Sequence, residues 1–199
     1  MAITNGYATL EQVKASLEIS DSFDDSIIEL AIESASRQID QECERFFYQL
    51  DNQTFYYSTD DPYLVETDDI RSITTLKTSE GGDGVFDTTW QPKDWQEEPL
   101  NGYVSGIATP TTRIRAIDDY LFPTEQSGEA LVQIVGDFGW ESVPIQITQA
   151  CVILSSRIFK RNDSPLGVAG FGDIGAIRVG FKDPDVHNLI MPFKKVRMG

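Results

Sequence analysis

The longest regular pattern in the chain is a stripe of apolar residues between residues 24 and 48. Its members are Ile28, Ile32, Ala35, Ile39, Cys43 and Phe46, and the other face carries the acidic residues Glu29, Glu33, Asp40, Glu42 and Glu44. Recurrence every three or four residues is typical of an amphipathic helix with one buried face. We expect Phe23, which precedes a candidate N-cap at Asp24, to pack on Ile28 as a hydrophobic staple.

A shorter helix is predicted before this one. Thr9 followed three residues later by Gln12 is a capping-box pattern, and Leu10, Val13 and Leu17 then fall on one side of a helix.

A further helix is predicted from Val143 to about residue 161. Pro144 suits the first turn of a helix, where its missing N–H costs nothing. No charged residue occurs from Val143 until Arg157. We therefore expect this helix to be packed on several sides, partly against residues 9–48.

Between the helical stretches the apolar pattern changes to a period of two. The runs are short, rich in aromatic and β-branched residues, and separated by turn sequences such as residues 81–84 and 99–102. This pattern predicts a small antiparallel β-sandwich or barrel.

The predicted fold class is therefore α+β, a helical bundle interrupted by a β insert and followed by an extended C-terminal tail. The expected parts are a helical domain from residues 1–49 and 143–163, an inserted β domain at residues 50–142, and a Gly-rich loop with an extended C-terminal arm at residues 164–199.

The composition allows a sizeable buried core, with 199 residues of which 40% are hydrophobic. No apolar run approaches the roughly 20 residues that span a bilayer, and the first residues lack the features of a signal peptide. Cys43 and Cys151 each fall on an apolar helix face, which predicts buried thiols in a protein made in the cytoplasm.

The charge is unevenly distributed along the chain. The formal net charge of −16 argues against a basic nucleic-acid-binding surface. Residues 151–199 hold four acidic and eight basic residues, so this segment is about +4 and residues 1–150 are about −20. Such asymmetry is typical of an interaction tail or of a basic surface that meets acidic neighbours, although a tail kept soluble by its charge has the same composition.

The chemical motifs do not predict an enzyme. Residues Gly170–Gly175 match G-x-G-x-x-G by letter, but a dinucleotide site needs a strand before the glycines and a helix after them, and the predicted order is the reverse. His187 is the only histidine, which argues against triads and multi-histidine zinc sites. Three acid pairs are best read as exposed turn carboxylates: Asp60–Asp61, Asp68–Asp69 and Asp118–Asp119. We expect no catalytic residue, no cofactor and no metal.

A carbohydrate-stacking platform is the alternative for the β insert. Its candidate residues are Trp90, Trp95, Tyr103 and Trp140. Aromatic side chains in strands more often fill a core or an interface.

Several segments, in their order along the chain, resemble head–tail connector (adaptor) proteins of long-tailed bacteriophages. That family opens with a short helix, an acidic turn and a long helix that ends near an aromatic pair. The corresponding segments are Thr9–Leu17, Asp24–Ile28, Ala35–Ile39 and Arg45–Phe47, followed by Val143–Arg161 and, more weakly, Pro192–Lys195. A β insert between the helices is similar to the longer members of the family.

The resemblance implies a structural protein of the virion, made in the cytoplasm of a bacterial host. It would form a ring, commonly dodecameric, beneath the portal protein, and would recruit a stopper or tail-completion protein. DNA would pass through the ring without specific binding, because an acidic wall repels phosphates, and no membrane would be involved. A β-sandwich module that binds carbohydrate or another ligand is the alternative function.

Three sets of residues are expected to serve such a ring. Acidic residues on the long helix, Glu33 and Asp40, are expected to face the channel. Contacts between neighbouring copies join two different faces, and the basic residues expected there are Arg157, Lys160 and Arg161. The segment expected to stay extended or disordered until it meets the portal comprises Leu189, Ile190, Met191, Pro192, Phe193, Lys194, Lys195 and Arg197.

Overall fold

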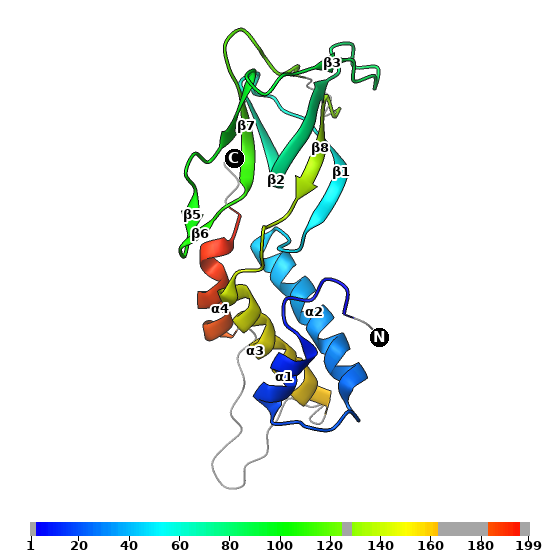
Figure 1. Ribbon diagram of the computed structural model, residues 1–199, viewed down its shortest axis with the longest axis vertical. Coiled ribbons are helices and arrows are strands. Elements are labelled where there is room, and N and C mark those ends of the chain that lie inside the picture. The colour runs from blue at the N-terminus through cyan, green and yellow to red at the C-terminus, as the bar shows by residue number, and fades with distance from the viewer. Residues whose placement is uncertain (1–2, 125–128, 163–182, 196–199) are drawn as a thin grey trace. The chain divides into compact units, whose positions relative to one another are not determined.

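The computed structural model describes residues 3–124, 129–162 and 183–195. The chain divides into two compact units, one formed by Met1–Arg45 with Val143–Gly199 and the other by Phe46–Ser142. The first unit is helical and the second is built around an antiparallel sheet (Figure 1). The expected α+β class is confirmed.

The helical unit begins with α1, Leu10–Leu17. The predicted capping box is present, because Thr9 Oγ1 accepts from Gln12 N at 3.2 Å and Gln12 Oε1 accepts from Thr9 N at 2.8 Å. The helix ends at Glu18, which has a left-handed backbone conformation.

The long helix α2, Asp25–Cys43, buries the predicted apolar stripe. Ile28, Ile32 and Ala35 are fully buried, and so is Cys43 at its end. The predicted hydrophobic staple is wrong, since Phe23 is 91% exposed. The carboxylate of Asp21 accepts a hydrogen bond from Phe23 N at 3.0 Å, and this local turn leaves the ring in solvent.

Helix α3, Ile145–Asn162, lies against α1, α2 and α4 (Figure 1). Its first turn uses the carbonyl of Pro144, which accepts from Ile147 N at 2.9 Å and Thr148 N at 3.0 Å. Ile147 and Cys151 are fully buried. The prediction of a helix packed on several sides is therefore confirmed.

The C-terminal segment differs from the extended arm expected from the sequence. Residues Pro184–Ile190 form helix α4, and Met191–Phe193 continue it as a 3₁₀ turn, η1. The Asp183 side chain caps α4 by accepting from Asp185 N and Val186 N, and Pro184 occupies the first helical turn. Val186, Ile190 and Phe193 are buried within the helical unit, so local capping and apolar spacing stabilise a helix here.

The main sheet of the second unit has six strands in the order β1-β8-β2-β7-β4, with β3 paired to β2. All pairs are antiparallel. The strands are β1 (Leu50–Tyr57), β2 (Leu64–Thr78), β3 (Thr88–Thr89), β4 (Trp95–Glu98), β7 (Thr111–Ala116) and β8 (Val132–Phe138). A separate hairpin joins β5 (Tyr103–Val104) to β6 (Ile107–Ala108).

The long strand β2 connects two parts of this sheet. Its first residues pair with β7 and its later residues with β8, and both ladders contain register shifts near Ile70. Gly136 of β8 sits at such an irregularity, where a Cβ atom would lie 2.1 Å from the carbonyl oxygen of Ser72. The described strands form an open path of pairings, and no closed barrel is seen among them.

Aromatic side chains fill the concave core of the sheet. Trp90 stacks on Phe122 with ring centroids 4.6 Å apart, and Phe55 stacks on Phe138 at 4.1 Å. The indole N–H of Trp140 donates to the Asp69 carboxylate at 2.8 Å in a buried position. These contacts place Trp90, Phe122, Phe138 and Trp140 in the interior of the β unit.

Candidate interaction surface

The two acidic residues expected to face a channel hold the N-terminal segment instead. Glu33 Oε1 accepts from Thr4 N at 2.6 Å and Asn5 N at 3.3 Å. The Tyr7 hydroxyl donates to an oxygen of Asp40. Both carboxylates therefore tie residues 4–7 to α2.

Arg37 completes this arrangement. Its Nε lies 2.9 Å from Asp40 Oδ2, and its guanidinium also donates to Asn5 O at 3.0 Å and lies over the Tyr7 ring. Burial raises the pKa of Asp40 above its ordinary value, while the Tyr7 hydrogen bond and the Arg37 charge oppose that rise. A channel-facing role for Glu33 and Asp40 remains a prediction, and any substitution there also alters these contacts.

The basic residues at the end of α3 fall into two groups. Arg157 Nη1 forms an ion pair with Asp183 Oδ2 at 2.5 Å and thereby joins α3 to the cap of α4. Lys160 and Arg161 are exposed, and neither has an acidic side chain within ion-pair distance in the described part of the chain. Arg157 is thus engaged within the subunit, and the inter-subunit role of all three residues stays a prediction.

The residues expected to bind a portal do not form one surface. Ile190 and Phe193 are buried in the subunit, and Leu189 is half-buried. Met191, Pro192 and Lys194 are exposed, with Met191 at 59%. Lys195 N donates to Cys43 O at 2.9 Å, which holds this segment against the end of α2. Arg197 lies outside the described residues.

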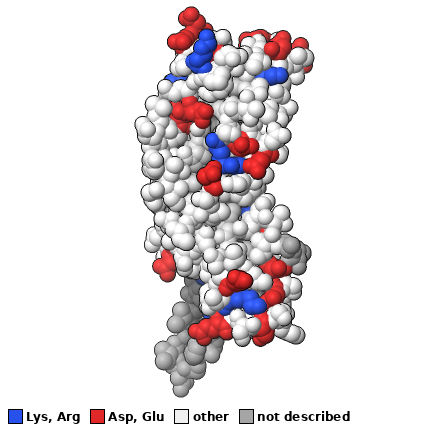
Figure 2. Space-filling view, viewed as in Figure 1, with Lys and Arg blue, Asp and Glu red and all other residues white. Residues whose placement is uncertain are grey.

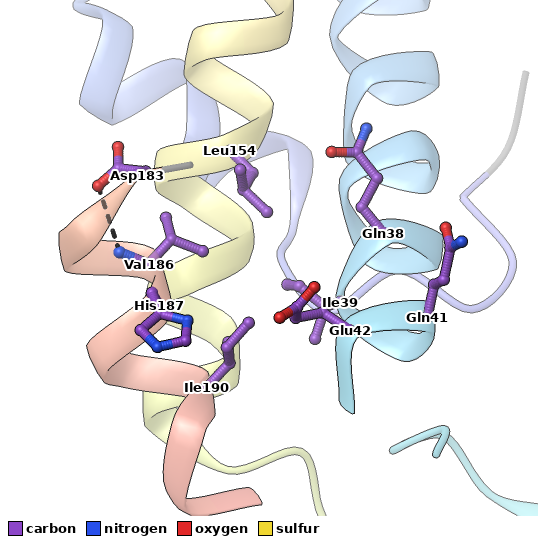
Figure 3. Close-up of a pocket in the computed structure, with 9 residues that line it drawn as sticks. All are labelled: Gln38, Ile39, Gln41, Glu42, Leu154, Asp183, Val186, His187 and Ile190. Carbon is purple, nitrogen blue, oxygen red and sulfur yellow. Dashed lines mark hydrogen bonds between the residues drawn. The ribbon is translucent and has the colours of Figure 1, made fainter. Parts of the chain in front are cut away.

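A groove of about 430 Å³ separates α2 from α4 above α3 (Figure 3). Apolar side chains from all three helices point into it, and Gln38, Gln41 and Glu42 line its α2 side. The nine lining residues are Gln38, Ile39, Gln41, Glu42, Leu154, Asp183, Val186, His187 and Ile190. The groove is lined by amide and apolar side chains and one histidine. Such a lining suits the binding of a side chain of a partner better than catalysis on a substrate.

Charged side chains do not form a continuous basic surface on the face seen in Figure 2. The basic groups there are small, and most have acidic neighbours. In the helical unit, examples are the pairs of Lys14 with Asp25 and of Lys194 with Glu42.

The other sequence motifs contribute no reactive centre in the parts that the structure describes. No group of three or more His, Cys, Asp or Glu side chains there could hold a metal ion. Asp61 and Asp69 serve local structure, since Asp61 Oδ1 accepts from Tyr63 N and Asp69 accepts from Trp140. Residues Gly170–Gly175 lie outside the described ranges. No helix among the described residues is long and apolar enough to cross a membrane.

The two cysteines are free and buried, as predicted. Burial raises the pKa of the Cys43 thiol to about 12 and also raises that of Cys151. Thiols held in this state are packing groups rather than nucleophiles.

The carbohydrate platform considered as an alternative is not formed. Trp90, Trp95 and Trp140 are at most 8% exposed and belong to the interior of the β unit. Only Tyr103, on the separate β5–β6 hairpin, is exposed, at 70%.

Part of the chain matches a known protein family. Residues 7–79 match the model described as Phage gp6-like head-tail connector protein. The resemblance to phage head–tail connectors is confirmed over these residues. The matched region covers α1, α2, β1 and β2, and it includes Tyr7, Glu33 and Asp40 but begins after Thr4 and Asn5.

Solved structures share the fold over the whole length of the chain. A chain in the neck of an empty gene transfer agent (GTA) particle computed with C6 symmetry has a TM-score of 0.57 at 15% identity, covering 100% of this chain and 94% of that one. A chain from the neck of a native GTA particle computed with C12 symmetry gives 0.57 at 16% identity with the same coverage. A chain from the virion of a native GTA particle gives 0.55 at 17% identity, again covering 100% and 94%. A search of curated proteins finds no match.

The family match leaves α3 and α4 to be interpreted from the structure alone. Both helices lie beyond residue 79, and they carry the exposed cations, the groove and the docked C-terminal segment. Sequence reasoning missed the groove because it is built from three separate segments of the chain. The Asp183-Pro184 capping signal was the local clue to α4.

Proposed function

We propose that this protein is a structural head–tail connector of a phage or phage-like particle. It forms a ring beneath the portal, extends the DNA channel and receives the next head-completion or tail protein. The observation that carries the proposal is the family match at residues 7–79, and the fold shared with GTA neck chains over the whole length supports it. The protein acts by assembly and catalyses no reaction.

The charge of the chain suits a conduit. At −16 overall, its surfaces repel phosphate, so DNA moves past without being retained. Oligomeric neck assemblies of C6 and C12 symmetry among the structural relatives support a ring as the working form, with twelve copies as the expected number. The site of action is the virion, after synthesis in the bacterial cytoplasm.

The portal contact is assigned to the exposed part of the C-terminal segment. Because Ile190 and Phe193 are buried in the subunit, the contact is assigned to the side chains of Leu189, Met191, Pro192 and Lys194, together with the predicted residues Lys195 and Arg197, of which Arg197 lies outside the described residues. Helix α4 and the turn after it present Leu189, Met191 and Pro192 from a fixed base, in place of an arm that orders only on binding.

Imaging of portal-bearing capsids tests this function directly. Capsids from the cognate particle, incubated with and without the purified chain, should gain a ring at one vertex only when the chain is present. If the vertex is unchanged and the chain appears elsewhere or not at all, the connector assignment is wrong.

A further inference from the structure

Helix α2 carries a second stripe on the side away from its buried face. Its members within the helix lie three or four positions apart and are Ile27, Leu30, Ser34, Gln38 and Gln41; Phe23, in the turn before the helix, continues the same spacing. None is charged, although α2 itself contains five acidic residues. We call these six residues the outer α2 stripe.

The apolar end of the outer α2 stripe is open to solvent. Phe23 is 91% exposed, Leu30 53% and Ile27 40%. Gln38 and Gln41 are also exposed at the other end, beside the groove. A solvated helix in so acidic a chain normally carries charge on its outer face, whereas an uncharged line at helical spacing is the pattern of a face covered by another helix.

Helix α3 has a matching line. Ile145 is 71% exposed, Gln149 is exposed and Ile153 is partly exposed, and the line ends at the exposed Lys160. Between Ile153 and Lys160 the helix passes Ser156 and Arg157, whose side chains contact Ser16 and Asp183 within the same subunit. We call Ile145, Gln149, Ile153 and Lys160 the outer α3 stripe.

The charges at the two stripes are complementary. Asp21 and Asp24 flank Phe23 at the start of the outer α2 stripe, and the Asp24 side chain makes no capping hydrogen bond. Lys160 and the adjacent Arg161 stand at the end of the outer α3 stripe without an acidic partner among the described residues. An antiparallel pairing brings these opposite charges together.

The spacing of the two stripes agrees with such a pairing. At about 1.5 Å rise per residue, the helical part of the outer α2 stripe (residues 27–41) is about 21 Å long and the outer α3 stripe is about 22 Å long. One antiparallel register then places Leu30 opposite Ile153 and Ser34 opposite Gln149. The same register places Phe23 near Lys160 and Gln38 opposite Ile145. A cation above the Phe23 ring is itself a favourable contact.

We infer that the outer α2 stripe of one copy packs on the outer α3 stripe of a second copy. Asp21 and Asp24 of the first copy then meet Lys160 and Arg161 of the second. The contact joins two different faces, so it repeats around a ring without a two-fold axis. The inference rests on the proposed function for its biological setting, and it names the surfaces that join neighbouring subunits.

Cross-linking between two variants that each carry one added cysteine tests the register. Leu30→Cys chains are mixed with Ile153→Cys chains under mild oxidation, and disulfide-linked pairs are followed on non-reducing gels. The buried native thiols of Cys43 and Cys151 stay out of the reaction. The matched control is Val85→Cys, an exposed apolar position of the β unit, mixed with Ile153→Cys. We expect pairs with Leu30→Cys to form at least tenfold faster than pairs with the control.

Charge reversal supplies a second measurement on the same full-length chain. Asp24→Lys in the Leu30→Cys chain, or Lys160→Glu in the Ile153→Cys chain, should alone slow formation of the cross-link severalfold. When both chains carry their reversal, the cross-linking rate should be restored. Equal rates for the Val85→Cys control and the Leu30→Cys pair overturn the inference, as does a charge reversal without effect.

The two proposals fail separately. If wild-type protein occupies the portal vertex while the cross-link stays at the control rate, the packing of the stripes is wrong and the connector function stands. If the cross-link forms and the vertex stays empty, the subunit contact stands and the connector function is wrong.

Discussion

Replacement of Asp183 tests whether the C-terminal segment is a docked helix in the free subunit. Its side chain accepts hydrogen bonds from Asp185 N at 2.9 Å and Val186 N at 3.3 Å, and it forms the ion pair with Arg157. Asp183→Ala removes both interactions. Asp183→Asn keeps a good N-cap and removes only the charge, which makes it the matched control.

The structure gives the size of the effect. Loss of an N-cap costs about 0.5–2 kcal/mol. The side chains of Arg157 and Asp183 are 33% and 16% exposed, so solvent screens their pair and it contributes about 0.2–1 kcal/mol. Asp183→Ala should therefore destabilise α4 by about 1–3 kcal/mol, and Asp183→Asn by about 1 kcal/mol or less.

Amide hydrogen exchange on residues 184–193 measures this locally. Because about 1.4 kcal/mol corresponds to a factor of ten in an equilibrium constant, protection should fall about 5- to 150-fold in Asp183→Ala and about fivefold or less in Asp183→Asn. Protection near zero in the wild type would mean that the segment is an extended arm after all. Equal losses in the two variants would mean that the ion pair, and not the cap, holds the helix.

Three further outcomes follow from the structure. The Arg115 hydrogen bond to Glu98 lowers the pKa of that carboxyl below its ordinary value of 4.5. The ionised Glu98 therefore stabilises the fold above pH 4.5, and this stabilisation is lost as the pH falls through the lower pKa of the folded state. In urea titrations, Glu98→Gln should lose less stability on acidification than the wild type, and identical profiles would contradict this. Gly136→Ala forces a Cβ against the carbonyl oxygen of Ser72 and should cost at least about 1–3 kcal/mol in thermal unfolding, whereas an unchanged melting temperature would contradict that close approach. Burial raises the pKa of the Cys43 thiol to about 12, so alkylation by iodoacetamide at pH 8 should wait for unfolding, and rapid labelling of the native chain would refute the burial.

Elements with a local signal were predictable from the sequence. Thr9 and Gln12 mark the start of α1, and the spacing from Ile28 to Cys43 marks the buried face of α2. Both depend on neighbours within a few residues, which the sequence displays directly. The aromatic and β-branched runs of the insert likewise predicted strands, but the division of β2 between two partners depends on long-range pairing.

The errors lie where distant contacts decide the outcome. Helix α4 has only seven residues, too few to be stable alone, and it forms because Ile190 and Phe193 are buried in the helical unit. The contact of Glu33 with backbone N–H groups 28 and 29 residues earlier in the chain was likewise not predictable from local sequence, and its channel-facing role stays a prediction drawn from the family resemblance. The staple at Phe23 failed because Asp21 offered a competing local hydrogen bond.

The two ends of the β unit are held together within that unit. Leu50 at the start of β1 pairs with Phe138 at the end of β8, and the Gln49 side chain donates to Glu141 O at 2.7 Å. Gly139 lies so close to Tyr48 that a Cβ atom would come within 1.9 Å of its carbonyl oxygen. These contacts fix the first and last residues of the β unit next to each other within that unit. Strands elsewhere in the unit can therefore be gained, lost or exchanged without moving the two points at which the chain enters and leaves it. Evolution can therefore alter what the insert presents while the helical framework keeps its own packing.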